Sequence, residues 1–146
     1  MEYELLLKQI ESIVNPKLPL YTNLANVSAV LAKLDNINWA GFYIVKDDSL
    51  YLGPFQGDVA CTIISKGKGV CGTSFANKET IIVDDVNKFP GHIACSSLSK
   101  SEIVVPIIKD GNIVAVIDID SPIYSRFVDK EKAFLEKIAS IISKLF

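Results

Sequence analysis

The sequence predicts an α+β protein built on an antiparallel sheet. Helical periodicity is confined to the two ends of the chain, apart from one short segment, and the middle carries short apolar runs that are typical of strands. Two of these runs flank an Asp-Gly pair, which is a strong signal for a hairpin. Strands and crossover helices do not alternate regularly, which argues against a doubly wound parallel sheet. An antiparallel sheet with helices packed on it accommodates the observed order of elements.

The first third of the chain predicts two helices. Residues 2–14 and 20–34 place apolar side chains at helical spacing. The first segment stops at Asn15-Pro16, because the residue before a proline is biased away from helical geometry. The second segment stops at the Asp-Asn pair of residues 35–36. We therefore expect a helical layer before the sheet begins.

The centre of the chain predicts the sheet, and the end predicts a closing helix. Alternating runs rich in aromatic and β-branched residues predict strands at 38–46, 50–55, 60–65, 80–83, 103–108 and 113–119. A short helix is expected over 70–77, and residues 84–100 form a long segment with little periodicity. A loop of that length in a compact domain is usually functional. Residues 129–146 begin with acidic side chains and then carry an apolar stripe, which predicts the last helix.

Length and charge narrow the possible classes of function. The 146 residues fit one domain spanning 1–146, and the net charge is only −2. No basic stripe is visible, so nucleic acid is not an expected partner. The apolar runs fall short of the ~20 residues that a membrane helix needs, and the N-terminus lacks the features of a signal peptide. We therefore expect a cytoplasmic protein that does not bind membranes.

Three acidic residues are expected to meet at one end of the last hairpin. Along residues 113–120, alternation places Asp118 and Asp120 on one face with Val114 and Val116, and places Ile113, Ala115, Ile117 and Ile119 on the other face, under the helices. Glu102 begins the partner strand, so the turn brings it toward both aspartates. Carboxylates this close repel each other, which raises the pKa of at least one. Such a cluster can bind an amino group, hold a metal or share a proton, although two aspartates facing solvent remain the alternative.

Two aromatic residues accompany this cluster. Trp39 and Tyr43 lie four residues apart on the first predicted strand and therefore share a face, with Gly41 between them. A glycine there leaves room for a ligand or for a crossing element. Aromatic rings beside acids can enclose a cationic amine or a methyl-sulfur group. The alternative is that these rings are part of an ordinary core face.

The three cysteines have different surroundings. Cys95 lies in the long loop among serines and close to Lys100, which is not the apolar setting of an inert thiol. Cys61 falls on a predicted strand and Cys71 at the start of the short helix, where a helix N-terminus lowers the pKa of a thiol. The alternatives are three buried apolar thiols, or a zinc site formed with His92. Structural zinc usually shows two cysteines separated by two to four residues, and no such pair is present.

The motifs together resemble those of a known family. The segments that carry the resemblance are NWAGFY (38–43), LGPFQGDVAC (52–61), GKGVCGTS (67–74), FPGHIACSSLSKSEIVVPI (89–107) and DGNIVAVIDIDSP (110–122). They are similar to those of the free methionine-(R)-sulfoxide reductases, which are GAF-domain enzymes, over roughly residues 20–140. The resemblance implies a six-stranded antiparallel sheet with helices packed on one face and a ligand pocket on the other.

The resemblance also implies roles for the cysteines. Cys95 matches the nucleophile, Cys61 the main resolving cysteine, and Cys71 a third cysteine that serves as an alternative disulfide partner. The thiol of Cys95 would become a sulfenic acid and then a disulfide, which a thioredoxin-type dithiol would reduce. No metal or organic cofactor is expected. Members of the family are often dimers, so a homodimer is a further expectation.

The remaining site residues would bind free methionine-(R)-sulfoxide. By the same resemblance, Glu102, Asp118 and Asp120 match the acids that hold the substrate amine, and Asp120 or Glu102 would give its proton to the sulfoxide oxygen. Trp39 and Tyr43 match the aromatic wall around the substrate. A GAF domain that binds a small molecule without turnover is the alternative function.

Overall fold

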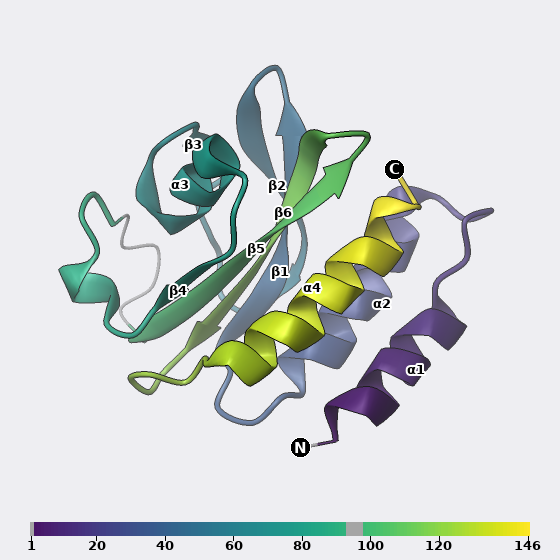
Figure 1. The fold of residues 1–146 in the computed structure, drawn as a ribbon, viewed down its shortest axis with the longest axis horizontal. Coiled ribbons are helices and arrows are strands. Elements are labelled where there is room, and N and C mark those ends of the chain that lie inside the picture. Colours follow the sequence, from purple (N-terminus) through teal and green to yellow (C-terminus); the bar gives the residue numbers. More distant parts are fainter. Residues whose placement is uncertain (1, 93–97) are drawn as a thin grey trace.

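A six-stranded antiparallel sheet forms the centre of the molecule, in the spatial order β3-β2-β1-β6-β5-β4 (Figure 1). The computed structural model describes residues 2–92 and 98–146. The strands of the sheet are β1 (Trp39–Lys46), β2 (Ser49–Gln56), β3 (Ile63–Ser65), β4 (Ile81–Val83), β5 (Ser101–Lys109) and β6 (Asn112–Ser121). The predicted fold class is confirmed.

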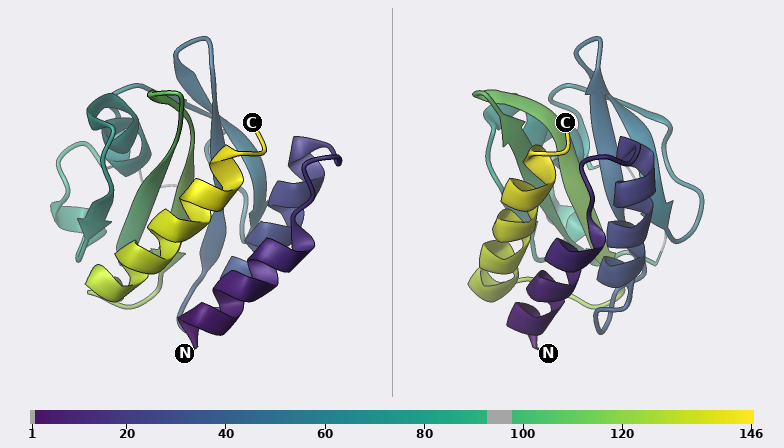
Figure 2. Two further views of the ribbon diagram at one scale, coloured as in Figure 1. Left: turned by 45° about the vertical axis from the view of Figure 1, so that its right-hand side comes forward. Right: turned by 90° about the vertical axis from the view of Figure 1, so that its right-hand side faces the viewer.

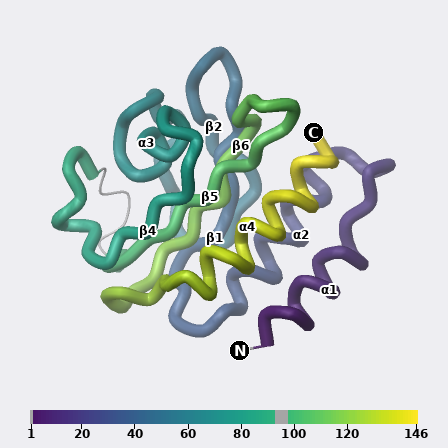
Figure 3. The backbone as a smooth tube through the Cα atoms, viewed as in Figure 1, coloured from purple at the N-terminus to yellow at the C-terminus, as the bar shows by residue number. Residues whose placement is uncertain are grey.

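The helices are divided unequally between the two faces of the sheet (Figures 1 and 2). On one face lie α2 (Leu20–Ala32) and α4 (Asp129–Ser143), and α1 (Tyr3–Ile13) packs across both of them. The opposite face carries α3 (Gly69–Asn77). A 3-10 turn (Val86–Lys88) follows β4 at the edge of the sheet, as the backbone trace in Figure 3 shows. None of the helices in the described part of the chain has both the length and the hydropathy needed to cross a membrane.

Two-residue turns fix the register of the central hairpins. The turn between β1 and β2 places Asp47 and Asp48 at φ values of 51° and 60°. Asp110 and Gly111 join β5 to β6 at 53° and 80°. Positive φ at both central positions matches the right-handed twist of the flanking strands, and aspartate and glycine tolerate it best. The Asp-Gly hairpin is therefore confirmed, and its register decides which side chains meet at its far end.

The sheet separates two hydrophobic cores. The larger core packs the sheet against α1, α2 and α4, and its β6 members are Ala115, Ile117 and Ile119. The smaller core lies beneath α3 and includes Trp39, Tyr43 and Val116. The predicted faces of β6 are thus correct over most of its length.

One end of β6 departs from the predicted alternation. Ile113 lies in the smaller core, and Val114 packs against the larger one. The cause is a β-bulge, because Ile107 pairs with Ala115 whereas Ile108 pairs with Ile113. A bulge inserts one unpaired residue and moves the side chains beyond it to the opposite face. The bulge lies next to the turn, so it leaves the acidic end of the strand unaffected.

Several predicted boundaries need correction. The third strand begins at Ile63, so Cys61 lies in the preceding loop rather than on a strand. β5 begins at Ser101 and therefore includes Glu102. The long segment 84–100 contains the 3-10 turn, and the last helix ends at Ser143.

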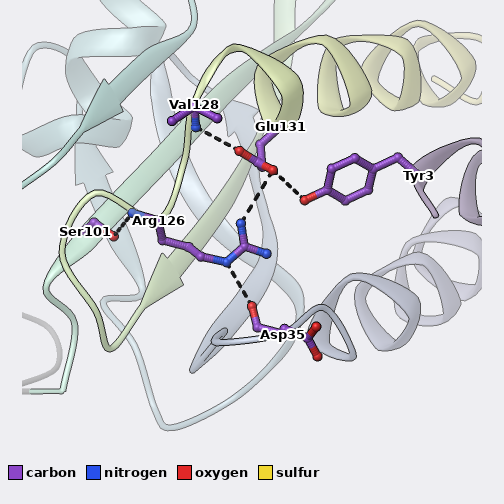
Figure 4. Close-up of polar contacts among 6 residues, drawn as sticks. All are labelled: Tyr3, Asp35, Ser101, Arg126, Val128 and Glu131. Atoms are coloured by element: carbon purple, nitrogen blue, oxygen red, sulfur yellow. Dashed lines mark hydrogen bonds and ion pairs between the residues drawn. The ribbon is translucent and has the colours of Figure 1, made fainter. Parts of the chain in front are cut away.

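A polar network anchors the beginning of β5 to the helical layer (Figure 4). Glu131 accepts hydrogen bonds from the Tyr3 hydroxyl at 2.6 Å and the Val128 amide at 2.8 Å, and it forms an ion pair with Arg126 at 3.6 Å. The Arg126 amide donates to the Ser101 hydroxyl at 3.3 Å. Burial opposes ionisation of Glu131, but these donors outweigh it and lower the pKa of that carboxyl. The network thus fixes the strand end that carries the acidic cluster.

Candidate active site

Three carboxyl groups converge on the sheet face beneath α3. Glu102 on β5 pairs directly with Asp120 on β6, and Val104 pairs with Asp118. Paired residues point to the same side of a sheet, so the three acids share one face. Glu102 and Asp118 are each only 6% exposed. The predicted convergence is confirmed, and the alternative of two aspartates facing solvent is wrong.

Burial and mutual repulsion raise the pKa of each of these acids. Burial is the largest cause for all three, and the charge of Asp118 adds to it at Glu102 and Asp120. Hydrogen bonds from Glu102 and Cys71 partly offset the effect of burial at Asp118. The three groups titrate together. Each member of the cluster therefore keeps its proton to a higher pH than an exposed carboxyl group does.

One oxygen of the cluster has no partner. Asp118 Oδ1 is buried and receives no hydrogen bond from the described residues. Neither ion pair found among these residues involves Glu102, Asp118 or Asp120. Buried carboxylates are normally paired, because an uncompensated charge away from water is costly. The cluster can therefore accept a cation or a further hydrogen-bond donor at this oxygen.

Aromatic side chains form the wall beside the acids. Trp39 stacks on Phe55 with ring centroids 5.1 Å apart and lies 6.0 Å from the ring of Tyr43. The Trp39 indole donates to the carbonyl of Asp58 at 3.0 Å, and the Tyr43 hydroxyl donates to the carbonyl of Cys61 at 2.9 Å. Both rings are nearly fully buried. The wall is thus rigid, and it positions the loop that carries Cys61.

Two glycines permit this arrangement. A Cβ at Gly41 would lie 2.3 Å from the Cβ of Phe55, so the neighbouring strand occupies the space that the sequence left open for a ligand or a crossing element. A Cβ at Gly57 would lie 2.5 Å from the ring of Trp39, and its φ of 136° disfavours other residues. The loop can therefore close directly over the indole.

A small cavity of about 50 Å³ lies between the acids, the aromatic wall and the start of α3. The described residues that line it include every acid and aromatic residue predicted for the site, together with others from the loops and from α3. The lining residues are Trp39, Tyr43, Val59, Ala60, Ile64, Lys68, Gly69, Val70, Cys71, His92, Ser99, Glu102, Asp118 and Asp120. The first turn of α3 therefore lines the same cavity as the acidic cluster.

The cysteines differ in state and position. Cys71 is a buried free thiol in the first turn of α3. Burial and the nearby charges of Asp118 and Glu102 raise its pKa, so the expectation that the helix N-terminus lowers it is wrong. Cys61 is disulfide-bonded and partly buried beside the aromatic wall. The predicted nucleophile, Cys95, lies outside the described residues.

The predicted zinc ligands do not gather as a set in the described part of the chain. His92 lines the cavity, and burial lowers the pKa of its imidazole. Cys61 is disulfide-bonded and offers no thiolate. Among residues 2–92 and 98–146, the donors that lie close together are Cys71, Glu102 and Asp118. The histidine-centred zinc site is therefore not supported.

Sequence reasoning missed several parts of the cavity. Ser99 hydrogen-bonds with Asp120 and accepts a hydrogen bond from Asn38 at 3.1 Å. Phe55 stacks on Trp39 and so belongs to the aromatic wall. The sequence placed Phe55 on a predicted strand but did not indicate that it belongs to the site. The sequence predicts a short helix over 70–77, but periodicity does not show that the start of this helix lines the cavity with the acids.

Replacing Glu102 by glutamine should stabilise the fold at alkaline pH. The pKa of Glu102 is raised in the folded state, so its unfavourable ionisation lowers stability as pH rises through that pKa. Glutamine removes this cost. We expect the melting temperature of Glu102→Gln at pH 8 to exceed that of the unmutated protein by at least about 2–4 °C, the shift produced by 1 kcal/mol in a domain of this size.

Glu131→Gln is the matched control for this melting experiment. The pKa of Glu131 is lowered, so its contribution to stability is present above the pKa of the unfolded state and lost as pH falls through the folded pKa. Its substitution should lower the melting temperature at pH 8. Equal melting temperatures for Glu102→Gln and the unmutated protein across the pH range would contradict the buried acidic cluster.

Comparisons with known proteins agree with this fold. The GAF domain family model matches residues 19–145, and the sheet with a pocket beneath α3 defines a GAF-domain protein. The free methionine-R-sulfoxide reductase of Saccharomyces cerevisiae is 49% identical over 150 residues, which cover 97% of this chain and 83% of the relative.

Two solved structures are also similar. The fRMsr of Staphylococcus aureus in its reduced form has a TM-score of 0.95 and 51% identity, covering 99% of this chain and 94% of that one. The free methionine-R-sulfoxide reductase from Neisseria meningitidis in complex with its substrate has a TM-score of 0.95 and 46% identity. The match covers 99% of this chain and 87% of that one. The chain belongs to the free methionine-R-sulfoxide reductase family of GAF domains.

Proposed function

We propose that this protein reduces free methionine-(R)-sulfoxide to methionine. The observation that carries the proposal is an acidic cluster beside an aromatic wall, in which the buried Asp118 Oδ1 atom has no partner within residues 2–92 and 98–146. The substrate's ammonium supplies the missing cation, and its methyl-sulfur end packs on aromatic faces. Names of close relatives support the same substrate.

Recognition depends on both charges of a free amino acid. Asp118, whose Oδ1 atom has no hydrogen-bond partner among the described residues, accepts a hydrogen bond from the ammonium. The first turn of α3 also lines the cavity, and its N-terminus lacks a side-chain cap. Its free amide groups and the helix dipole favour a carboxylate there. In a peptide the substrate's nitrogen is a neutral amide, so the site selects against peptide-bound methionine sulfoxide.

The chemistry needs a thiolate and a proton donor. The Cys95 thiolate attacks the sulfoxide sulfur while Asp120 or Glu102, held protonated by burial, gives a proton to the oxygen. The S–O bond breaks, the oxygen leaves on Cys95 as a sulfenic acid, and methionine is released. The sulfur of the substrate gains two electrons, and the cysteine sulfur loses two. No metal or organic cofactor takes part in these steps.

A second cysteine completes the cycle. The Cys61 thiol condenses with the sulfenic acid of Cys95 to form a disulfide and water. The disulfide state of Cys61 supports this role. A thioredoxin-type dithiol then reduces the disulfide. Cys71 serves as an alternative disulfide partner. The cytoplasmic location and the homodimer expected from the sequence stay predictions.

A coupled assay tests the proposal. Purified protein is mixed with thioredoxin, thioredoxin reductase, NADPH and free methionine-(R)-sulfoxide, and NADPH oxidation is followed by absorbance. We expect turnover that depends on the sulfoxide and yields one methionine for each NADPH consumed. If direct analysis of the mixture finds no methionine, the protein is a GAF domain that binds a small molecule without converting it.

Cys61→Ser should separate chemistry from recycling. The variant keeps the nucleophile, so it should form about one methionine per protein in a single turnover. Its steady-state rate with thioredoxin should fall by at least about tenfold, because the sulfenic acid lacks its resolving thiol. Normal recycling by this variant would identify Cys71 as the resolving cysteine, which Cys61→Ser combined with Cys71→Ser would then block.

A further inference from the structure

Cys71 has no role in the chemistry proposed above beyond that of an alternative disulfide partner, yet its thiol lies against the acidic cluster. The Cys71 sulfur and one carboxylate oxygen each from Glu102 and Asp118 all lie within 4.8 Å of one another. All three residues are buried. They come from three elements, α3, β5 and β6, whose relative positions are fixed by the sheet and its smaller core.

We propose that Cys71, Glu102 and Asp118 form a binding site for a thiophilic divalent cation of the Zn²⁺ class. The donor set contains one sulfur and two carboxylate oxygens, which suits Zn²⁺ and does not suit the all-oxygen preference of Mg²⁺ or Ca²⁺. Donor atoms around tetrahedral zinc are roughly 3.5 Å apart, given metal–ligand distances near 2.0–2.3 Å. Side-chain movements of about 1 Å therefore complete the site from the observed positions.

A second observation points to a cation at the same place. Asp118 lines the cavity, and its Oδ1 atom is buried and lacks a hydrogen-bond partner among the described residues. A bound metal would satisfy this oxygen and replace the protons on Glu102 and Cys71. Three protein ligands leave the fourth position of a tetrahedral ion facing the cavity.

Zn²⁺ and substrate would occupy overlapping space. The proposed ammonium site uses Asp118, which is also a ligand of the proposed metal, and the metal removes the proton from Glu102. Bound Zn²⁺ should therefore inhibit turnover in competition with substrate. This competition rests on the proposed function, whereas binding of the metal does not.

Cobalt binding tests the site without reference to activity. In Cys61→Ser/Cys95→Ser protein without a tag, Cys71 is the only thiol. Titration with Co²⁺ should saturate at one equivalent and produce the near-ultraviolet absorption of cobalt–thiolate ligation. Zn²⁺ should abolish this absorption by displacement. Absence of the thiolate band in folded protein would overturn the proposal.

Variants identify the ligands. Cys71→Ser and Cys71→Ala in the same background should lose the thiolate band, and Asp118→Asn and Glu102→Gln should weaken Zn²⁺ binding, measured against a chromophoric chelator, at least about tenfold. Asp47→Asn, at the distant β1–β2 turn, is the matched control and should bind as the parent does. Undiminished Zn²⁺ binding by Asp118→Asn and Glu102→Gln would overturn the proposed site.

The parent protein tests the competition separately. Free methionine should weaken Zn²⁺ binding, and Zn²⁺ should raise the KM for the sulfoxide without lowering kcat. Metal binding with unchanged turnover would overturn the competition. If the protein shows no turnover even without metal, the proposed function fails, and the cobalt titration still decides whether the site exists.

Discussion

Replacing Cys95 by serine should abolish methionine formation, even in a single turnover. A serine hydroxyl stays protonated at neutral pH and is a far weaker nucleophile than a thiolate toward sulfur. We therefore expect less than about 0.1% of the parent rate, in line with losses seen when a nucleophile is removed. Rapid mixing of reduced protein with one equivalent of free methionine-(R)-sulfoxide, followed by amino-acid analysis, measures this directly.

Cys71→Ser is the matched control for the nucleophile. It removes the thiol of Cys71, which lines the cavity beside the acidic cluster, and leaves Cys95 unchanged. The control should still form methionine in a single turnover. If Cys95→Ser retains the chemistry and Cys71→Ser loses it, the nucleophile is the buried thiol of α3, and the assignment from resemblance is wrong.

Asp120→Asn should lower kcat by at least about 100-fold, which lies within the range of general acid catalysis. Asparagine keeps the shape of the side chain and its place opposite Glu102, but it cannot deliver the proton. Steady-state kinetics with dithiothreitol as reductant measure the effect without depending on thioredoxin. Asp84→Asn, an exposed residue after β4, is the control and should retain the parent rate.

The role proposed for Asp120 also predicts the direction in which the rate changes with pH. Burial and the charge of Asp118 raise the pKa of Asp120, and the proposed mechanism requires its protonated form. The single-turnover rate should therefore fall as pH rises through the pKa of the cluster, once the thiolate has formed. A mild effect of Asp120→Asn, together with loss of activity in Glu102→Gln, would move the acid to Glu102.

The sequence predicts those parts of the site that depend on turn residues and on the alternation of side chains along a strand. The Asp-Gly turn defines a hairpin, and alternation then places Glu102, Asp118 and Asp120 together without further information. The same reasoning placed Trp39 and Tyr43 on one face. The turn of a hairpin fixes which residues of its two strands pair. These contacts can therefore be predicted from residues that are close in the sequence.

The remaining features depend on contacts between distant segments. The bulge beside Ile113 depends on how β5 and β6 pack between the two hydrophobic cores. No residue of the Asp-Gly turn predicts it. Burial of Cys71 follows from packing of α3 on the sheet, which reverses the pKa shift expected from the helix N-terminus alone. The stack of Phe55 on Trp39 needs the close approach of two strands at Gly41. Such effects are set by tertiary packing, which periodicity does not encode.

The most direct test of the central claim compares free with N-acetylated methionine-(R)-sulfoxide. Acetylation removes the positive charge that Asp118 and its neighbours are proposed to bind and leaves the sulfoxide unchanged. With dithiothreitol as reductant, we predict that kcat/KM for the free amino acid exceeds that of the acetylated compound by at least about 100-fold, because a buried polar site strongly rejects a ligand that leaves it unpaired. Comparable values for the two compounds would contradict recognition of the ammonium by the acidic cluster.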